Sequence, residues 1–551
     1  MLPSAKAPLA TATLLVTGLV GALSVGGTAD AARGSAGPAP GPSADDPTFR
    51  VHENGQVFYV EPQPTGPAGP ARAPALTRAK RAAALELHSL PGSDHVIYLD
   101  FDGHTVEDTV WNEGKNGMPE RFYPGWDREA DGPAFSPTEL DRIHDIWLWV
   151  AEDFAPFDVD VTTEDPGDDA ITRTGPADPT YGARVLLTDD AEANASEDCD
   201  GCYGVANLDV FDKTEGHAYN QPTWVFPGDN TTKSIADTVS HEVGHNFGLD
   251  HDGLGKEEYY QPELEDHDGW GPLMGAPDNV PLSQWSNGDY GGTRDQDDIA
   301  VIARNGAPFR ADEAGGTVTS AGAFPAEPAI ITERTDADVF ALGECEGPME
   351  IDARPASVSP NLDIELTLLD GDGDEVAVDD PPSQAVDDRT ATGLDASIAG
   401  TATSAASYFV RVDGVGRGPA TTSYSDYGSV GTYTLAASGC DLTPPVLDPE
   451  RPERPSIVDV VPGERGGERT ATVSWEPPAN AGAAAITGYQ LRAFKIRRGR
   501  VVQKTISDVL PADTRDATWS ESGGKYRFTV RAVNELGNGL WSSRSDIVRI
   551  R

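Results

Sequence analysis

The fold and the chemistry of this chain are decided by one stretch of its sequence, His241-Glu242-Val243-Gly244-His245-Asn246-Phe247-Gly248-Leu249-Asp250-His251-Asp252. Residues four apart share a face of a helix, so the imidazoles of His241 and His245 can bind one metal ion together. Gly248 can end the helix in a left-handed conformation, which lets the chain return and offer His251 as third ligand. Three neutral nitrogen ligands leave a fourth position for water, as in catalytic rather than structural zinc sites.

Glu242 is the candidate general base of this site. It follows the first histidine directly and can reach a water molecule on the zinc, which is acidic enough there to lose a proton near neutral pH. The whole pattern fixes five positions, so chance is a poor explanation for it. The alternative is a helix that carries ordinary surface histidines. The stretch therefore predicts hydrolysis by an activated water molecule.

The stretch resembles the zinc motif of the metzincin metalloproteases, HExxHxxGxxH followed by a Met-turn. Met274, in Gly271-Pro272-Leu273-Met274-Gly275, lies 23 residues after His251. The resemblance implies that Met274 packs beneath the zinc without binding it, and that the domain has an upper α/β part and a small lower part. An aspartate directly after the third histidine, here Asp252, resembles the motif of the reprolysin (adamalysin-like) branch. Ala276 stands where some other branches have a tyrosine ligand, so that ligand is not expected.

Three alternatives to a catalytic metzincin site stay open. Thermolysin-like peptidases use a downstream glutamate as third ligand, and Glu265 stands 20 residues after His245, although without the helical motif of that class. A purely structural zinc site needs a fourth protein ligand. A non-catalytic adhesin would be expected to have lost Glu242 or a histidine, and it has lost none. His217 and His267 flank the motif and are expected to be polar loop residues.

The sequence before the motif alternates between strand and helix patterns, which indicates an α/β domain. A helix is expected over residues 136–154, with a proline in its first turn and with Ile143, Trp147 and Val150 on one face. Strands are expected over residues 95–101, 159–163, 183–187 and 223–226.

The helix that carries the zinc motif is expected to begin at Ser234, whose hydroxyl can cap it. Asp237 would then place a negative charge in the first turn, where the helix dipole favours it. Ile235, Val239 and Val243 recur at helical spacing and are expected to face the core.

The first residues indicate an export signal. Lys6 precedes an apolar stretch from Leu9 to Val25, and Ala29-Asp30-Ala31 is a cleavage site of the A-x-A type. An uncleaved membrane anchor is the alternative. We expect a signal peptide over residues 1–31, a secreted, extracellular protein, and no stable membrane insertion after signal removal, because no second stretch is long enough to span a bilayer.

Residues 32–92 are expected to be a propeptide or linker, which would make the chain a zymogen. Phe49 to Glu61 alternates around Asn54-Gly55, a pattern typical of a hairpin, and Pro62 to Pro74 is rich in Pro and Gly. The basic run Arg78-Ala79-Lys80-Arg81 is either a processing point or the solvated face of a short helix. No cysteine precedes Cys199, which excludes a thiol-to-zinc latency switch in this segment.

The four cysteines fall into two pairs, and the export signal places them in an oxidising compartment. Cys345 and Cys440 lie near the two ends of one β-rich segment and can staple it. Cys199 and Cys202 form Cys-Asp-Gly-Cys, for which a small loop disulfide is favoured. A redox pair or half of a zinc site are the alternatives, but no second cysteine pair lies nearby.

The charge of the chain is strongly negative and unevenly distributed. The 551 residues carry a formal net charge of −49. Residues 451–551 hold 17 Lys and Arg against 11 Asp and Glu, or +6, which leaves −55 for the first 450. The asymmetry indicates separate modules, and the negative charge excludes nucleic acid as a partner because the two would repel each other. Ca²⁺ stays open, since no acidic cluster identifies a ligand set.

Two all-β sandwiches are expected after the catalytic domain, over residues 311–442 and 456–551, joined by a Pro-rich linker at 443–455. Asp336-Ala337-Asp338-Val339-Phe340 and Tyr408-Phe409-Val410-Arg411-Val412 resemble bacterial prepeptidase C-terminal domains. Trp475 and Tyr526, as a core tryptophan and a tyrosine corner, resemble a fibronectin type III domain. In Asp370-Gly371-Asp372-Gly373-Asp374 a tight turn is favoured over a calcium loop.

The sequence as a whole predicts a multidomain protein with a metzincin-like α/β catalytic domain over residues 93–310 and two all-β sandwich domains. The predicted function is that of a secreted endopeptidase with one catalytic Zn²⁺, which hydrolyses peptide bonds in extracellular proteins. Its partners would be protein or peptide substrates, with surface or matrix contact through the C-terminal sandwiches. The alternative is a non-catalytic zinc-containing adhesin.

Overall fold

The computed structural model describes residues 46–550 except 64–74, 114–116, 130, 131, 133, 197, 198, 200, 443–451, 453, 465, 466, 498, 499, 521 and 543. The expected signal peptide, residues 32–45 and most of the expected linker at 443–455 lie outside the described residues. Within the described part, no helix combines the length and the apolar character needed to cross a bilayer.

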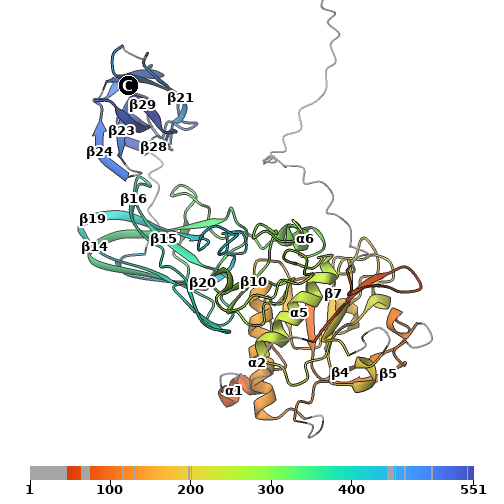
Figure 1. Ribbon diagram of the computed structural model, residues 1–551. Coiled ribbons are helices and arrows are strands. Elements are labelled where there is room, and N and C mark those ends of the chain that lie inside the picture. The colour runs from red at the N-terminus through yellow and green to blue at the C-terminus, as the bar shows by residue number, and fades with distance from the viewer. Residues whose placement is uncertain are drawn as a thin grey trace, which may run out of the picture. The chain divides into compact units, whose positions relative to one another are not determined.

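A seven-stranded sheet forms the framework of the first domain (Figure 1), in the order β1-β2-β8-β9-β7-β3-β6. The strands β6, β3, β7 and β9 run parallel, whereas β8 is antiparallel to β9 and β2 is antiparallel to β8. The sheet therefore starts earlier in the chain than the expected boundary at residue 93. Its strands are β1 Phe49–Val51, β2 Val57–Glu61, β3 His95–Asp100, β6 Asp160–Thr162, β7 Tyr181–Leu187, β8 Gly204–Asn207 and β9 Thr223–Val225.

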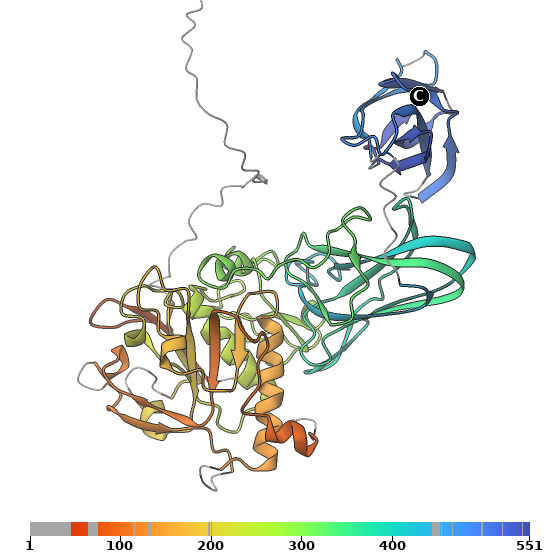
Figure 2. The same ribbon diagram turned by 180° about the vertical axis from the view of Figure 1, so that it is seen from behind.

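Two long helices cover one face of this sheet. α2 (Pro137–Asp153) and α5 (Thr232–Phe247) lie side by side in Figure 1, and Figure 2 shows α2 beside the strands from behind. Val185, from β7, packs in their shared core, while Tyr98 faces the other side against α3 (Asp168–Ile171). Because both faces are covered, consecutive residues of β3 such as Ile97 and Tyr98 are both buried.

The α2 helix starts and ends where the sequence predicts. Ser136 caps it by accepting a hydrogen bond from the amide of Glu139, whose side chain reaches back to the amide of Ser136. Ile143 and Val150 are buried as expected. Trp147 is only half-buried. Its indole nitrogen donates to the carbonyl of Val161 in β6.

The predicted start of α5 is wrong by almost one turn. Thr231 caps the helix by accepting a hydrogen bond from the amide of Ser234, so Ser234 is already the third helical residue. Asp237 consequently lies in the second turn, where it pairs with Lys233. The helix begins earlier because Thr231 offers the same capping hydroxyl upstream.

The basic run at residues 78–81 lies in a short helix, α1 (Arg78–Ala82). The guanidinium of Arg81 forms a bidentate ion pair with Asp141 of α2, with two N···O distances of 2.6 Å. This contact favours the helical interpretation over a processing point. The remaining elements of the domain are β4 Gly103–Val106, η1 Val110–Asn112, β5 Arg121–Pro124, α4 Ala191–Asn194, η2 Ala218–Asn220, η3 Asp266–Asp268, β10 Trp270–Pro272, β11 Leu282–Gln284 and α6 Asp298–Arg304.

The second domain is all-β, as predicted. Cys345 and Cys440 are directly opposite each other in paired strands and form the expected disulfide. The predicted tight turn is confirmed, since the amide of Gly373 donates to the carbonyl of Asp370 between β15 and β16. Its strands are β12 Gly322–Ala323, β13 Ala329–Ile331, β14 Ala337–Pro355, β15 Ile364–Asp370, β16 Glu375–Asp379, β17 Gln384–Asp387, β18 Thr390–Thr392, β19 Ala396–Gly414 and β20 Gly431–Cys440.

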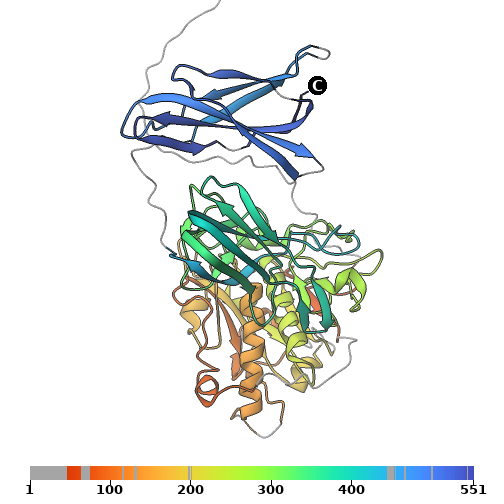
Figure 3. The ribbon, with the colours of Figure 1, turned by 90° about the vertical axis from the view of Figure 1, so that its left-hand side faces the viewer.

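The third domain is a two-layered β-sandwich (Figure 3). Trp475 lies in its core, and the hydroxyl of Tyr526 donates to the carbonyl of Ser522 at 2.7 Å, which is the expected tyrosine corner. Its strands are β21 Ser456–Pro462, β22 Thr470–Glu476, β23 Ile486–Arg497, β24 Arg500–Ile506, β25 Leu510–Pro511, β26 Asp516–Ser520, β27 Gly524–Asn534, β28 Gly537–Trp541 and β29 Val548–Ile550.

Candidate metal centre

The three histidines of the motif come together at the C-terminal end of α5. His241 and His245 lie one turn apart, and the helix ends at Gly248, whose φ of 95° is left-handed as predicted. The chain then turns back and brings Nε2 of His251 to 3.1 Å from Nε2 of His245. All three side chains are buried, and their nitrogens lie with a carboxylate in a cluster whose ligand atoms are within 4.8 Å of one another.

The imidazoles on α5 are oriented through their second nitrogens. Nδ1 of His241 lies 2.9 Å from the carbonyl oxygen of Leu273, and Nδ1 of His245 lies 2.7 Å from that of Leu249. A carbonyl oxygen can only accept, so each Nδ1 carries the proton. Each ring thus turns its Nε2 toward the cluster, and this nitrogen is the one available to a metal ion when the imidazole is neutral.

The carboxylate of the cluster is Glu61, which the sequence analysis did not single out. Its Oε1 lies 3.0 Å from Nε2 of His251 and 3.4 Å from Nε2 of His245, and its Oε2 lies 3.6 Å from Nε2 of His241. Asp46 binds the other nitrogen of His251, with Oδ2 at 2.9 Å from Nδ1. The segment expected to be a propeptide thus supplies two carboxylates to the histidine cluster.

The charges in the cluster depend on one another. Burial would raise the pKa of Glu61, but the charges and hydrogen bonds of the histidines outweigh it and hold that pKa well below the usual value. Burial lowers the pKa of His245 to about 4. Burial also opposes a charge on His251, yet Glu61 and Asp46 overcome it and raise the pKa of His251 to about 9. The anionic side chains thus hold a positive charge at the cluster.

Glu242 lies fully buried beside this cluster. Both of its carboxylate oxygens, and Nε2 of His241, have no hydrogen-bond partner among the described residues. Burial, followed by the negative charge of Glu61, raises the pKa of Glu242 well above its usual value. Buried polar atoms without partners are rare in native proteins, so this set fits a bound cation and water. Imidazole and carboxylate donors in this number suit zinc.

The strand β8 passes directly against Glu242. A Cβ atom on Gly204, the first residue of β8, would lie 1.9 Å from Oε1 of Glu242 and 2.6 Å from its Cδ. Only a glycine leaves room for the carboxylate at this point. The general-base candidate therefore lies at the strand that runs beside the histidine cluster.

Met274 packs against the motif helix α5 at Gly244. It is fully buried, and its sulfur lies so close to α5 that a Cβ on Gly244 would be 2.5 Å from it. Gly244 stands between the two helical histidines. The adjoining carbonyl of Leu273 binds Nδ1 of His241, and the carbonyl of Met274 accepts from the amide of Asp252. The turn thus holds both ends of the ligand stretch.

Two tyrosines at the site were not predicted. The hydroxyl of Tyr259 lies 3.2 Å from Nε2 of His251, on a loop that follows the motif. Tyr59 stacks on the ring of His245 with centroids 4.6 Å apart, and its hydroxyl donates to Asp250 at 2.8 Å. The position of Tyr259 shortly after the motif was the only sequence signal available for it, and that signal does not separate it from the adjacent Tyr260.

The other candidates from the sequence lie away from the cluster. Glu265 is exposed and is not among the described ligand groups, so the thermolysin-like arrangement is not formed. Nε2 of His217 binds the carbonyl of Phe211, and Nδ1 of His267 binds the hydroxyl of Tyr260. His217 precedes η2 and His267 lies in η3, so neither is a plain loop residue, and neither belongs to the described histidine cluster.

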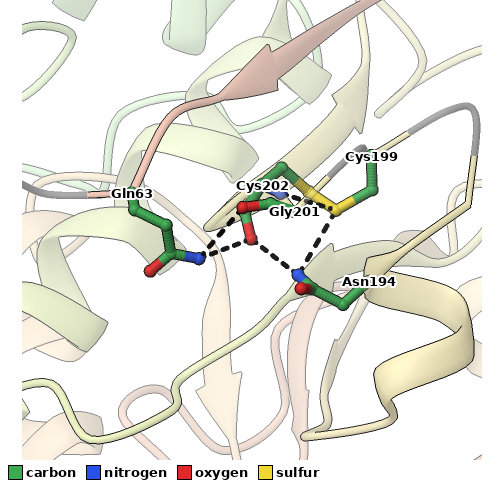
Figure 4. Close-up of a disulfide and its surroundings, with 5 residues drawn as sticks. All are labelled: Gln63, Asn194, Cys199, Gly201 and Cys202. Carbon is green, nitrogen blue, oxygen red and sulfur yellow. Dashed lines mark hydrogen bonds between the residues drawn. A yellow bond between two sulfur atoms is a disulfide. The ribbon is translucent and has the colours of Figure 1, made fainter.

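The predicted disulfide between Cys199 and Cys202 is formed just before β8 (Figure 4). The side-chain amide of Asn194 donates to the carbonyl of Cys202 at 2.7 Å. Gln63 follows β2. Its side-chain amide donates to the carbonyl of Cys202 at 2.8 Å and to the carbonyl of Gly201 at 3.3 Å. The disulfide loop therefore fixes the end of β2 beside the site.

A pocket adjoins the cluster and gives the site an opening. It extends from the histidine cluster toward the loop after Met274. Its lining includes Glu61, Tyr203, Thr238, His241, Tyr259 and Pro277.

Two parts of the chain match family models. Residues 177–252 match metallo-peptidase family M12B Reprolysin-like, and residues 457–548 match the fibronectin type III domain. The first match covers β7, β8, β9, α5 and all three histidines. It identifies a reprolysin-like metallopeptidase region, and this family implies zinc as the metal. The second match covers most of the third domain.

Curated relatives match a short part of the chain. Cardiac-type myosin-binding protein C of Mus musculus and of Homo sapiens are each 32% identical over 114 residues, which is 19% of this chain and 8% of the relative. The chain thus spans less than a tenth of their length. Among solved structures, the FN5 domain of Drosophila Lar is 26% identical, with 18% of this chain and 95% of that chain covered and a TM-score of 0.14. The twitchin kinase region of C. elegans is 21% identical, with 18% and 17% covered and a TM-score of 0.15.

Proposed function

We propose that this protein is a secreted, zinc-dependent endopeptidase that hydrolyses peptide bonds in extracellular proteins. The observation that carries the proposal is the buried, unpartnered carboxylate of Glu242 beside three converging histidines. The reprolysin-like match over residues 177–252 supports it. The mixed sheet, the α5 helix and the packing of Met274 against Gly244 further support a metzincin-like catalytic domain.

The residues of the site divide the chemistry between them. A zinc ion held by His241, His245 and His251 would polarise a peptide carbonyl and lower the pKa of water toward ~7. Glu242 accepts the proton of the attacking water and passes it to the leaving amine. The hydroxyl of Tyr259 donates a hydrogen bond to the oxygen on which negative charge develops.

The C-terminal domains serve as contact modules in this proposal. The second domain is a prepeptidase C-terminal-like sandwich, and the third belongs with fibronectin type III domains, as its match supports. In the part of these domains that the structure describes, no residue belongs to the histidine cluster. Their role would be to hold the enzyme at a surface or matrix where its substrates lie.

A second candidate function is a closed, non-catalytic zinc site in an adhesin. The carboxylate of Glu61 favours it, because four protein ligands are typical of structural zinc. A structural site, however, gives no reason to bury a second carboxylate without a partner at Glu242. We therefore place catalysis first.

The test is unbiased cleavage of a peptide library, followed by mass spectrometry. The carboxylate of Glu61 contacts all three imidazoles, so the full-length chain used in the test carries Glu61→Gln. It is compared with the double variant Glu61→Gln, Glu242→Gln. The expected result is cleavage that a zinc chelator stops and that the double variant lacks while still binding one zinc. Adding Glu265→Gln instead should leave cleavage unchanged. Stoichiometric zinc without any cleavage in the Glu61→Gln chain would favour the adhesin.

A further inference from the structure

The N-terminal hairpin adds a strand to the sheet at the metal centre. β2 pairs antiparallel with β8 from Phe58 opposite Asn207 to Glu61 opposite Gly204. On its other side β8 pairs with β9. Without β2, the edge of β8 that faces away from β9 would be exposed. An exposed strand edge is a ready binding site for an extended peptide.

The register of β2 places one of its residues against the catalytic groups. Glu61 is paired with Gly204, and Gly204 is the residue whose missing Cβ makes room for Glu242. The amide of Tyr203 also donates to the carbonyl of Glu61 at 2.7 Å. A peptide backbone on this edge therefore passes Glu242 at the position that Glu61 holds.

Alternate side chains of β2 cover the histidines. In a strand, residues two apart face the same side, and Tyr59 and Glu61 both face the cluster. Tyr59 packs on His245, and Glu61 reaches all three imidazoles through its carboxylate. The β1–β2 hairpin is held on both sides, by Asp46, which precedes β1 and contacts His251, and by Gln63, which follows β2 and contacts the disulfide loop (Figure 4).

We propose that Glu61 is the fourth protein ligand of the zinc and that β2 occupies the peptide-binding edge of β8, so that the chain is latent until this strand leaves. The inference rests on the proposed function. The inference adds two details to the proposed function: the ligand at the fourth position of the zinc, and the edge of β8 as the surface on which an extended peptide substrate binds.

One observation favours a displaceable ligand over a permanent one, and two consequences of the proposal fit it. Among the described residues, Glu61 is the one member of the cluster from outside the motif stretch, and it comes from the segment expected to be a propeptide. The carboxylate excludes water from the fourth position, which explains how β2 can lie along the edge of β8 beside Glu242 without being cut. Finally, its negative charge balances part of the charge of a divalent ion, so the closed state needs no cysteine.

The test uses Co²⁺ in place of zinc in the full-length chain, because its absorption spectrum reports the ligands. The wild-type spectrum should not change between about pH 6 and 9, since no water is bound to ionise. Glu61→Gln should give a spectrum that changes with pH, and adding acetate to Glu61→Ala should restore the wild-type spectrum. Glu53→Gln, in the exposed turn of the same hairpin, should match the wild type.

The second readout is the binding of acetohydroxamate, which needs an open position on the metal. It should bind the Co²⁺ form of Glu61→Gln at least about tenfold more tightly than the wild type, a difference of about 1.4 kcal/mol. Equal affinities and identical spectra in the two proteins would overturn the role of Glu61.

A third variant, His245→Ala, separates this inference from the proposed function. If it keeps its Co²⁺, the histidine cluster is not the metal site and both proposals fall. If it loses Co²⁺ while Glu61→Gln behaves as the wild type, only the latency inference falls. Loss of Co²⁺ together with the expected change in Glu61→Gln supports both.

Discussion

Oε1 of Glu61 lies 3.0 Å from Nε2 of His251, although 190 residues separate them in the sequence. This contact connects a strand of the N-terminal hairpin to the last histidine of the motif. Through this contact the hairpin forms part of the candidate metal centre. On the proposed account, activity requires β2 to leave the edge of β8. Glu61→Gln removes the carboxylate that ties β2 to the three histidines, so the activity predictions below concern the chain that carries this substitution.

The first prediction concerns Gly204. Gly204→Ala places a Cβ 1.9 Å from Oε1 of Glu242, so the carboxylate must move away. A displacement of about 1 Å costs on the order of 10²-fold in rate. Peptide cleavage should fall by at least that factor, while zinc content measured by atomic absorption stays at one per chain. Unchanged cleavage would mean that Glu242 does not act from its place against β8.

The second prediction concerns Tyr259, whose hydroxyl lies 3.2 Å from Nε2 of His251. Tyr259→Phe removes the donor but keeps the ring. If the hydroxyl stabilises developing negative charge, kcat should fall about 10²-fold with little change in KM or zinc content. The matched control is Tyr260→Phe on the adjacent residue, which should leave kcat nearly unaltered. A fall in zinc content without a fall in kcat per zinc would assign Tyr259 a structural role.

The third prediction concerns the packing of Gly244 on Met274. Gly244→Ala puts a Cβ 2.5 Å from the sulfur of Met274, and overpacking of this kind costs about 1–3 kcal/mol. Met274→Ala alone leaves a cavity and should also lower the stability. Met274→Ala frees the space that the new Cβ needs. The double variant should therefore lose less free energy of unfolding than the two single variants lose together. Additive losses, measured by denaturant unfolding, would show that the two residues do not touch.

The fourth prediction is a pH dependence of stability that arises from Glu152 in α2. Burial raises its pKa to about 8, against hydrogen bonds from Thr432 that lower it. Between the ordinary value of about 4.5 and about 8, the folded chain holds a proton that the unfolded chain has lost. The free energy of unfolding therefore falls as the pH rises through this range and levels off above it.

Glu152→Gln should remove this contribution. Its denaturation midpoint should drop less between pH 5 and pH 8 than that of the wild type, whereas Glu86→Gln on the surface should follow the wild type. Asp153, whose pKa burial raises to about 7, keeps part of the slope in both proteins. Identical slopes for Glu152→Gln and the wild type would contradict the buried, protonated state of Glu152.

The sequence was sufficient where function depends on local spacing. The helical repeat brings His241 and His245 together, and Gly248 lets the chain return with His251, so all three could be predicted from one stretch. Met274 could be placed only through a family resemblance, because no periodicity links it to the helix. The capping error at Ser234 arose because Thr231 offers an equivalent hydroxyl one turn earlier.

Glu61 could not be predicted, because strand pairing brings it to the site. Its hairpin was recognisable from Asn54-Gly55, but nothing local shows that β2 adds to β8 and not to another edge. Register then decides which side chain meets the histidine cluster, since a shift of one residue would turn Glu61 away. Long-range pairing of this kind leaves no periodic signal in one sequence.

The measurement that tests the central claim most directly is a zinc titration of metal-free Glu61→Gln chain while peptide cleavage is recorded. We expect the rate to rise in proportion to zinc, to stop rising at one equivalent, and to stay at background when Glu242→Gln is added to a chain that binds zinc equally. Cleavage that is independent of zinc, or that persists without the carboxylate of Glu242, would contradict the assignment of this histidine cluster as a hydrolytic centre.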